Sequence, residues 1–175
     1  GDSESVDDGD IHPEKDTRFH VVGNKTEGAL LILAQSKFFN EDDYEARRVQ
    51  ANFGNSGGSR LFPFSSKRKR MSVLVKENED WMLFHKGAGE IVLDNCSTYL
   101  DKDGSVKPLT AAKRKYFEDT LSSYASQALR CVALAHRSNI DKLVSPDTCS
   151  VEECEQKLEK DMTLNALVGI VDPLR

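Results

Sequence analysis

The residues with the clearest chemical potential stand at Phe84–Glu90, where an apolar stretch runs into a lysine, two glycines and a carboxylate. The preceding stretch has the aromatic content of a buried strand, and the following one has the pattern of a short helix. Gly87 and Gly89 are therefore expected in a turn, where glycine lets a ligand approach the backbone closely. Lys86 would offer an anion an ammonium group at the end of a strand. A tight turn with a solvated lysine explains the same residues without a ligand.

A second candidate is the basic run Lys67–Arg70, which lies between aromatic and β-rich residues. Because alternate side chains of a strand share a face, the two lysines are expected to point one way and the two arginines the other. One face could then attract phosphate while Phe64 stacks on a base. The alternative is a solvated hairpin end with Phe64 in the core.

Two further charged residues need an explanation. Arg130 interrupts the apolar stretch 128–135, which otherwise suits the protein interior, so its guanidinium requires a carboxylate or an anionic ligand. Glu27 stands at the start of an expected helix capped by Thr26. There it either complements the helix dipole or accepts a hydrogen bond from a ligand amine. None of these signals decides the function alone.

The elements that must position these residues alternate between strands and helices. Strands are expected at 61–64, 71–76, 79–85, 129–136 and 164–171, and helices at 27–34, at 90–97, after Thr110 and from Ser150 to about Lys160. The stretch 129–136 reads as a fully buried strand. Interspersed strands and helices with at least one hairpin favour an α+β fold with a largely antiparallel sheet.

Length and charge limit the classes of function. A chain of 175 residues can form one domain with a real core. Residues 1–16 carry seven acidic side chains, so we expect an acidic flexible lead over 1–18 and a folded domain over 19–175. The formal net charge of −5 argues against general nucleic-acid binding. No apolar run approaches the roughly 18 residues of a membrane span, so no direct membrane insertion is expected.

Common nucleotide-binding, catalytic and metal motifs are missing from the sequence. It contains no G-x-x-x-x-G-K-[ST], no complete dinucleotide fingerprint, no G-x-S-x-G and no H-E-x-x-H. Its four cysteines lack paired C-x-x-C spacing. We therefore expect no catalytic residue and no metal site, and neither a P-loop enzyme nor a Rossmann fold.

Five ordered segments together resemble the nucleotide-binding domain of P-type cation-transporting ATPases. They are Gly23–Glu27, Phe64–Ser72, Lys86–Glu90, Leu129–Ala133 and Asp172–Arg175, within residues 20–175. The first two look most like plasma-membrane-type calcium pumps. Gly89 stands where that family most often has proline, and Leu174 replaces the second proline or a valine of the closing hinge motif.

The resemblance implies a twisted, mainly antiparallel sheet flanked by helices and carrying an ATP site. The site residues that it implies are Glu27, Phe64, Lys69, Met71, Lys86, Gly87 and Arg130. Adenine would stack on Phe64 and hydrogen-bond to Glu27, while Arg130 would reach the phosphates. Lys69 and Lys86 would line the pocket, with Met71 as an apolar wall.

The same resemblance implies one domain of a larger membrane enzyme, ending at the hinge to an absent phosphorylation domain. The Asp-Lys-Thr-Gly-Thr phosphorylation motif is not in the sequence. The domain would therefore present ATP, on the cytoplasmic side of a membrane, to an aspartate elsewhere in the pump, with the phosphorylation and actuator domains as partners. Mg²⁺ would act in the full-length pump, and this chain would bind ATP without turnover. The alternative is a non-enzymatic interaction module that recognises a charged partner through the acidic lead and the basic run.

Overall fold

The computed structural model describes residues 24–37, 46, 59–77, 80–140, 143–145 and 147–171. The acidic lead and the closing segment 172–175 lie outside the described residues, so expectations about them stay predictions. The chain divides into two compact units, residues 1–40 and 41–175. Each unit is described by itself.

The described part of the first unit is helix α1, Lys25–Lys37, with Asn24 before it. The side-chain oxygen of Asn24 accepts a hydrogen bond from the backbone N–H of Thr26 at 2.9 Å. Its carbonyl accepts the N–H of Gly28 at 3.0 Å. Asparagine is a favoured N-cap because its side chain satisfies an N–H group of the first turn. Asn24 is thus the cap, and the expectation that Thr26 caps this helix is wrong.

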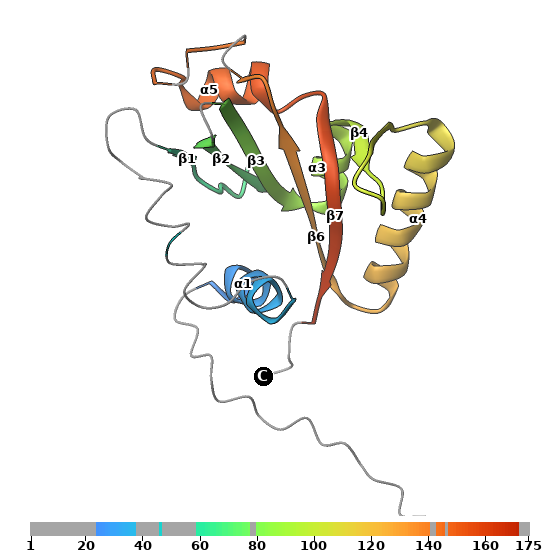
Figure 1. The fold of residues 1–175 in the computed structure, drawn as a ribbon. Helices are drawn as coiled ribbons and strands as arrows, with labels where there is room; N and C mark the ends of the chain where they lie inside the picture. The colour runs from blue at the N-terminus through green and yellow to red at the C-terminus, as the bar shows by residue number, and fades with distance from the viewer. Residues whose placement is uncertain are drawn as a thin grey trace, which may run out of the picture. The chain divides into compact units, whose positions relative to one another are not determined.

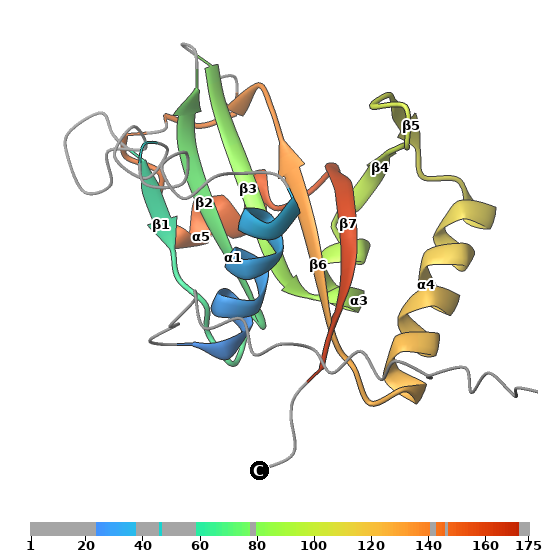
Figure 2. The ribbon, with the colours of Figure 1, turned by 60° about the horizontal axis from the view of Figure 1, so that its bottom comes forward.

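Among the described residues of the second unit, seven strands form one twisted sheet in the order β1-β2-β3-β6-β7-β4-β5 (Figures 1 and 2). Their bounds are β1 Arg60–Phe62, β2 Arg70–Glu77, β3 Asp80–Ala88, β4 Cys96–Leu100, β5 Val106–Pro108, β6 Arg130–Arg137 and β7 Met162–Ile170. Neighbouring strands are antiparallel except β4 and β7, which are parallel. The expected α+β fold with a mainly antiparallel sheet is confirmed.

The helical segments described in the second unit are α3 Gly89–Asp94, α4 Ala111–Ser126 and α5 Val151–Glu153, which continues into the π-helical segment η2 Cys154–Leu158. Thr110 caps α4 by accepting the backbone N–H of Lys113. Ser150 and Glu153 form a reciprocal capping box at α5. Both expected caps are confirmed. Within the described part of the chain, no helix has the length and apolar content of a membrane span.

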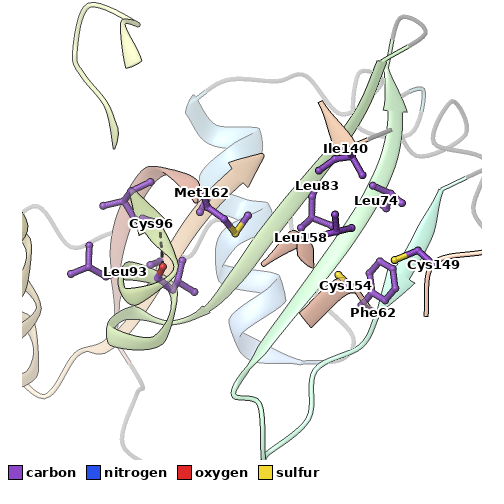
Figure 3. Packing of buried hydrophobic residues seen from close by; sticks show 14 of the residues in the cluster. Phe62, Leu74, Leu83, Leu93, Cys96, Ile140, Cys149, Cys154, Leu158 and Met162 are labelled. Carbon is purple, nitrogen blue, oxygen red and sulfur yellow. Dashed lines mark hydrogen bonds between the residues drawn. The ribbon is translucent and has the colours of Figure 1, made fainter. Parts of the chain in front are cut away.

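One face of the sheet carries the core, because alternate residues of neighbouring strands are buried there. The buried residues of β2, β3 and β6 on this face are Ser72, Leu74, Leu83, His85, Ala133 and Ala135. Phe62, Leu158 and Met162 belong to the same hydrophobic cluster as these two leucines and two alanines (Figure 3). The opposite face of the same strands carries the residues on which the candidate site depends.

Two boundaries differ from expectation around the lysine-glycine segment. β3 continues through Gly87 to Ala88, and Gly89 is the first residue of α3. The expected turn is therefore absent here, because Gly87 pairs with both Arg70 of β2 and Ala133 of β6.

Strand β6 also differs from expectation, because it is not buried throughout. Its burial changes from residue to residue along the strand.

Candidate functional site

The centre of the candidate site is a cross-strand pair on the face opposite the core. Met71 of β2 lies directly opposite Lys86 of β3, and Lys86 lies directly opposite Leu134 of β6. Opposed residues in antiparallel strands share a face, with Cβ atoms about 5 Å apart. The sheet register therefore brings an ammonium group next to apolar side chains, which suits a ligand with an apolar part and an anionic part.

Lys69 and Gly87 lie close together at one end of the β2–β3 pair. The carbonyl of Lys69 accepts the N–H of Ala88 at 3.0 Å, and the N–H of Lys69 donates to the carbonyl of Ser65 at 2.7 Å. A Cβ atom on Gly87 would lie 2.6 Å from both the Lys69 carbonyl oxygen and the Arg70 Cβ atom. The close approach of the two strands thus requires glycine at this position. Its expected role in giving a ligand room stays a prediction.

Two phenylalanines near this end lie in opposite environments. Phe62, the last residue of β1, is 2% exposed and belongs to the core, whereas Phe64 is 59% exposed (Figure 3). Pro63 stands between them and has no N–H to donate to a strand ladder, which fits the end of β1 at Phe62. The alternative that placed Phe64 in the core is therefore wrong. The structure offers its ring as a surface for stacking.

The four cations of the basic run separate in the folded chain. Lys67 and Lys69 are exposed, whereas Arg68 is only 8% exposed and Arg70 is partly buried. Both arginines form ion pairs with the carboxylate of Glu159, Arg68 through Nη2 and Arg70 through Nε at 2.6 Å. The lysines and the arginines do separate, but strand alternation is not the reason, because residues 66–68 form a turn and Lys69 precedes β2. Because the arginines pair with Glu159 and Glu155, the exposed lysines are the cations of this run that a ligand can reach.

Glu159 is a buried carboxylate that the sequence did not predict. It follows η2, is 1% exposed, and also accepts the hydroxyl of Ser72 at 2.6 Å. Burial alone would raise its pKa, but hydrogen bonds from Ser72 and the arginines Arg70 and Arg68 hold the pKa of Glu159 below its ordinary value. The basic run was a signal for such a residue, because arginines that alternate with other residues next to a strand imply a buried carboxylate as their partner. Nothing local identified which carboxylate that was.

Burial also affects the histidine next to this carboxylate. His85 lies opposite Ser72 in the β2–β3 pair, and its Nδ1 atom is 2.8 Å from the Ser72 hydroxyl oxygen. Burial lowers the pKa of His85 to about 4, although the charge of Glu159 acts in the other direction. The ring is therefore neutral at pH 7. The core side of the pair thus holds one buried anion and no cationic histidine.

Arg130 lies on the same face as the Met71–Lys86 pair, but farther along the sheet. It is the first residue of β6 and pairs with Ile170 of β7, and its side chain is exposed. Four residues of extended strand separate it from Leu134, which corresponds to about 13 Å. The apolar stretch around Arg130 is therefore not an interior run throughout, because Arg130 stands at the exposed end of β6, whereas Val132 on the same face is buried.

Six of the seven predicted site residues belong to one unit. They are Phe64, Lys69, Met71, Lys86, Gly87 and Arg130, with Lys69, Met71, Lys86 and Gly87 as the closest group. Glu27 lies in the first turn of α1, in the other unit, so its part in the site stays a prediction. Among the residues that the structure describes, no group of three His, Cys, Asp or Glu side chains could hold a metal ion.

The fold agrees with a comparison against protein families. The family model described as P-type ATPase, cytoplasmic domain N, matches residues 5–175. The chain therefore belongs to the cytoplasmic N-domain family of P-type ATPases. The resemblance seen in the five ordered sequence segments is confirmed.

Relatives of the chain include calcium-transporting ATPases of several organisms. It is 40% identical over 161 residues to calcium-transporting ATPase PAT1 of Dictyostelium discoideum, covering 90% of this chain and 13% of that protein. It is 36% identical over 165 residues to the plasma membrane-type calcium-transporting ATPase 8 of Arabidopsis thaliana, covering 93% and 14%. The endoplasmic reticulum calcium ATPase srcA of Aspergillus fumigatus is 34% identical over 178 residues, covering 94% and 18%. The chain thus spans less than a fifth of these relatives' lengths.

Proposed function

We propose that this chain binds ATP and, as part of a calcium-transporting P-type ATPase, presents its terminal phosphate to an aspartate in a separate domain. The observation that carries the proposal is the Met71–Lys86 pair close to the exposed Lys69 and Phe64, in a chain of the N-domain family. The assignment to calcium transport rests on the names of its relatives. The phosphorylation and actuator domains of the same pump would be its partners, on the cytoplasmic side of the membrane.

The proposed adenine contacts come from two aromatic and apolar side chains and one carboxylate. Phe64 would stack on the base, which contributes about 1 to 3 kcal/mol for aromatic side chains in general. Met71 would form an apolar wall beside it. Glu27 would accept a hydrogen bond from the 6-amino group of adenine, a position at which guanine carries a carbonyl oxygen.

The proposed phosphate contacts come from three cations. Lys69 and Lys86 would supply ammonium groups at the end of the β2–β3 pair where Gly87 allows the two strands to approach closely. Arg130, about 13 Å along β6 from the position opposite Lys86, would hold the far end of an extended triphosphate. Its guanidinium can bind phosphate oxygens with two parallel hydrogen bonds.

We infer that binding itself does not depend on a metal held by this chain. Aromatic stacking and cationic side chains are sufficient for a nucleotide, and Mg²⁺ would bridge phosphate oxygens during transfer in the full-length pump. Phosphoryl transfer also needs an acceptor aspartate in the family motif, which is not in the sequence. We therefore expect the chain to bind ATP in EDTA, and to form neither phosphoprotein nor free phosphate from γ-labelled ATP with Mg²⁺.

Protection of Lys86 tests the proposal against the alternative of a protein-docking module. Bound ATP should slow the reaction of Lys86 with an amine-reactive reagent, whereas Lys102, exposed on the β4–β5 hairpin, should react at the same rate with and without ATP. Lys86→Glu should abolish ATP binding in a calorimetric titration, and Lys102→Glu should leave it intact. Equal losses from both variants would indicate non-specific electrostatics and refute the proposed site.

A further inference from the structure

The carboxylate of Glu159 accepts most of its hydrogen bonds from the segment that leads into the candidate site. Its Oε1 atom accepts hydrogen bonds from Arg68 Nη2 and from the Ser72 hydroxyl, the latter at 2.6 Å. Its Oε2 atom accepts Arg70 Nε at 2.6 Å. Three donors from one short stretch of chain therefore converge on a single buried anion, which fixes the stretch more strictly than apolar packing would.

The hydrogen-bond network around Glu159 continues into β3 through Ser72 and His85. Ser72 has one hydroxyl proton, and it goes to Glu159, so the hydrogen bond between Ser72 and His85 uses the Nδ1–H of the histidine. The Nε2 atom of His85 is then an acceptor, and it faces the side-chain Nδ2 of Asn95 at 3.5 Å. A neutral ring with a lowered pKa fits this arrangement. Each hydrogen bond in this series is therefore donated in the direction of Glu159. The series links β2 and β3 on the core side of the sheet.

The residues of this network alternate with residues of the candidate site. Ser72 follows Met71 in β2, and His85 precedes Lys86 in β3. Because successive strand residues point to opposite faces, whatever fixes Ser72 and His85 below the sheet also fixes their neighbours above it. Lys69 precedes β2 with a φ of 52°, and the ion pairs of Arg68 and Arg70 with Glu159 hold the chain on both sides of it.

Arg68 also fixes the turn that carries Phe64. Its Nη1 atom donates to the carbonyl of Pro63 at 3.3 Å, and its backbone N–H donates to the Ser65 hydroxyl at 3.2 Å. The residues before and after Phe64 are therefore both hydrogen-bonded to Arg68. Arg70 also donates from Nη1 to the carbonyl of Arg68 at 3.3 Å, which closes the connection onto β2.

We propose that Glu159 is a positioning residue for the nucleotide site, acting through Arg68 and Arg70 on the turn and strand that carry Phe64, Lys69 and Met71. The inference rests on the proposed function. A guanidinium that is paired in a fixed geometry orients the backbone around it. Arg70 also pairs with Glu155 at 2.8 Å, whereas the contact of Arg68 with Glu155 is 3.9 Å long, so Arg68 depends most on Glu159. Glu159 thereby affects ligand binding indirectly, from the opposite face of the sheet.

The matched substitutions Glu159→Gln and Glu152→Gln test this role. Both remove one negative charge from neighbouring segments, but Glu152 is exposed and contacts the Gln156 side chain at 3.1 Å. ATP affinity is measured by titration at a temperature where circular dichroism shows each variant fully folded. We expect Glu159→Gln to weaken binding by about five- to tenfold and Glu152→Gln by less than about twofold.

A double-mutant cycle with Lys69→Ala separates positioning from general destabilisation. If Glu159 acts through the segment that holds Lys69, the double variant should lose less affinity than the product of the two single losses. Independent, multiplicative losses would contradict the inference. Should Glu159→Gln fail to fold, Ser72→Ala removes one donor from the same carboxylate and should weaken binding by about two- to fivefold. Wild-type affinity in folded Ser72→Ala would then overturn the inference.

The outcomes also distinguish the inference from the function on which it rests. Wild-type affinity in folded Glu159→Gln overturns the positioning role and leaves the proposed ATP site in place. Absence of ATP binding by the unaltered chain overturns both.

Discussion

On the core side of the β2–β3 pair, Arg70, Ser72 and His85 are held in a hydrogen-bonded network around Glu159. On the opposite face of the same two strands, Met71 and Lys86 lie side by side as cross-strand neighbours. The two sets are neighbours in sequence and differ only in which face strand alternation gives them. The basic run is also not one feature, because Arg68 and Arg70 pair with Glu159 whereas Lys67 and Lys69 are exposed.

The difference between the two sides follows the chemistry of arginine and lysine. Guanidinium groups are planar and weakly hydrated, and they bind carboxylates with fixed geometry, so Arg68 and Arg70 tolerate burial against Glu159. Ammonium groups are compact and strongly hydrated, and Lys67 and Lys69 remain exposed.

Arg68→Ala should produce the largest effect, because it removes one partner of a buried ion pair. Breaking such a pair costs about 3 to 5 kcal/mol of folding free energy. The exposed neighbour gives a matched control, and Lys67→Ala should change stability by less than about 0.5 kcal/mol. Urea unfolding at pH 7 measures both. Similar losses in the two variants would mean that the core side and the opposite side are not energetically distinct.

Acidification should destabilise the core side. The pKa of His85 is lowered to about 4 from its ordinary 6.5, so the unfolded chain takes up this proton first and stability falls between pH 6.5 and 4. At about 1.4 kcal/mol per pKa unit, the loss is on the order of 3 kcal/mol. The pKa of Glu159 is also lowered, so its contribution is present above the ordinary carboxylate pKa and is lost at still lower pH.

The pH dependence is measured by urea unfolding in steps from pH 7 to pH 4. His85→Gln should flatten the stability curve over this interval. His136, which contacts Asn165 on the other side of the sheet, provides the control, and His136→Gln should keep the wild-type slope. An unchanged slope in His85→Gln would place the acid sensitivity elsewhere.

Phe64→Ala should affect binding and leave stability unchanged. Loss of stacking should weaken ATP binding by about 1 to 3 kcal/mol, while the free energy of unfolding changes by less than about 0.5 kcal/mol because the ring is exposed. Phe62→Ala should behave in the opposite sense and cost about 3 to 5 kcal/mol of stability, because that ring is in the core. ATP titration and urea unfolding of both variants reveal the contrast. Unchanged affinity in Phe64→Ala would show that adenine does not stack on Phe64.

Local patterns predicted the elements of the fold but not all of their boundaries. The caps at Thr110 and Ser150 were recognisable because a capping side chain bonds within its own turn. Asn24 and Thr26 are both capping types, and only the path of the chain into α1 decides between them. Gly87 reads locally as a turn, yet pairing with strands on both sides makes it part of β3.

Long-range pairing explains what the sequence could not reveal about the site. Glu159 is 91 residues from Arg68, and no periodic pattern connects two positions so far apart. The ordered segments supplied the candidate residues, and the hairpin register then brought Met71 to Lys86. The relation of Glu27 to these residues remains a prediction, because α1 belongs to the other unit.

Nucleotide-induced chemical-shift changes, mapped along the chain by NMR, test the central claim most directly. Addition of ATP should shift the amide signals of Phe64, Lys69, Met71, Lys86 and Gly87 most strongly. Helix α4 and the β4–β5 hairpin should remain unperturbed and serve as the internal control. Shifts concentrated on α4 or the hairpin, or none at all at saturating ATP, would contradict the assignment of this face as the nucleotide site.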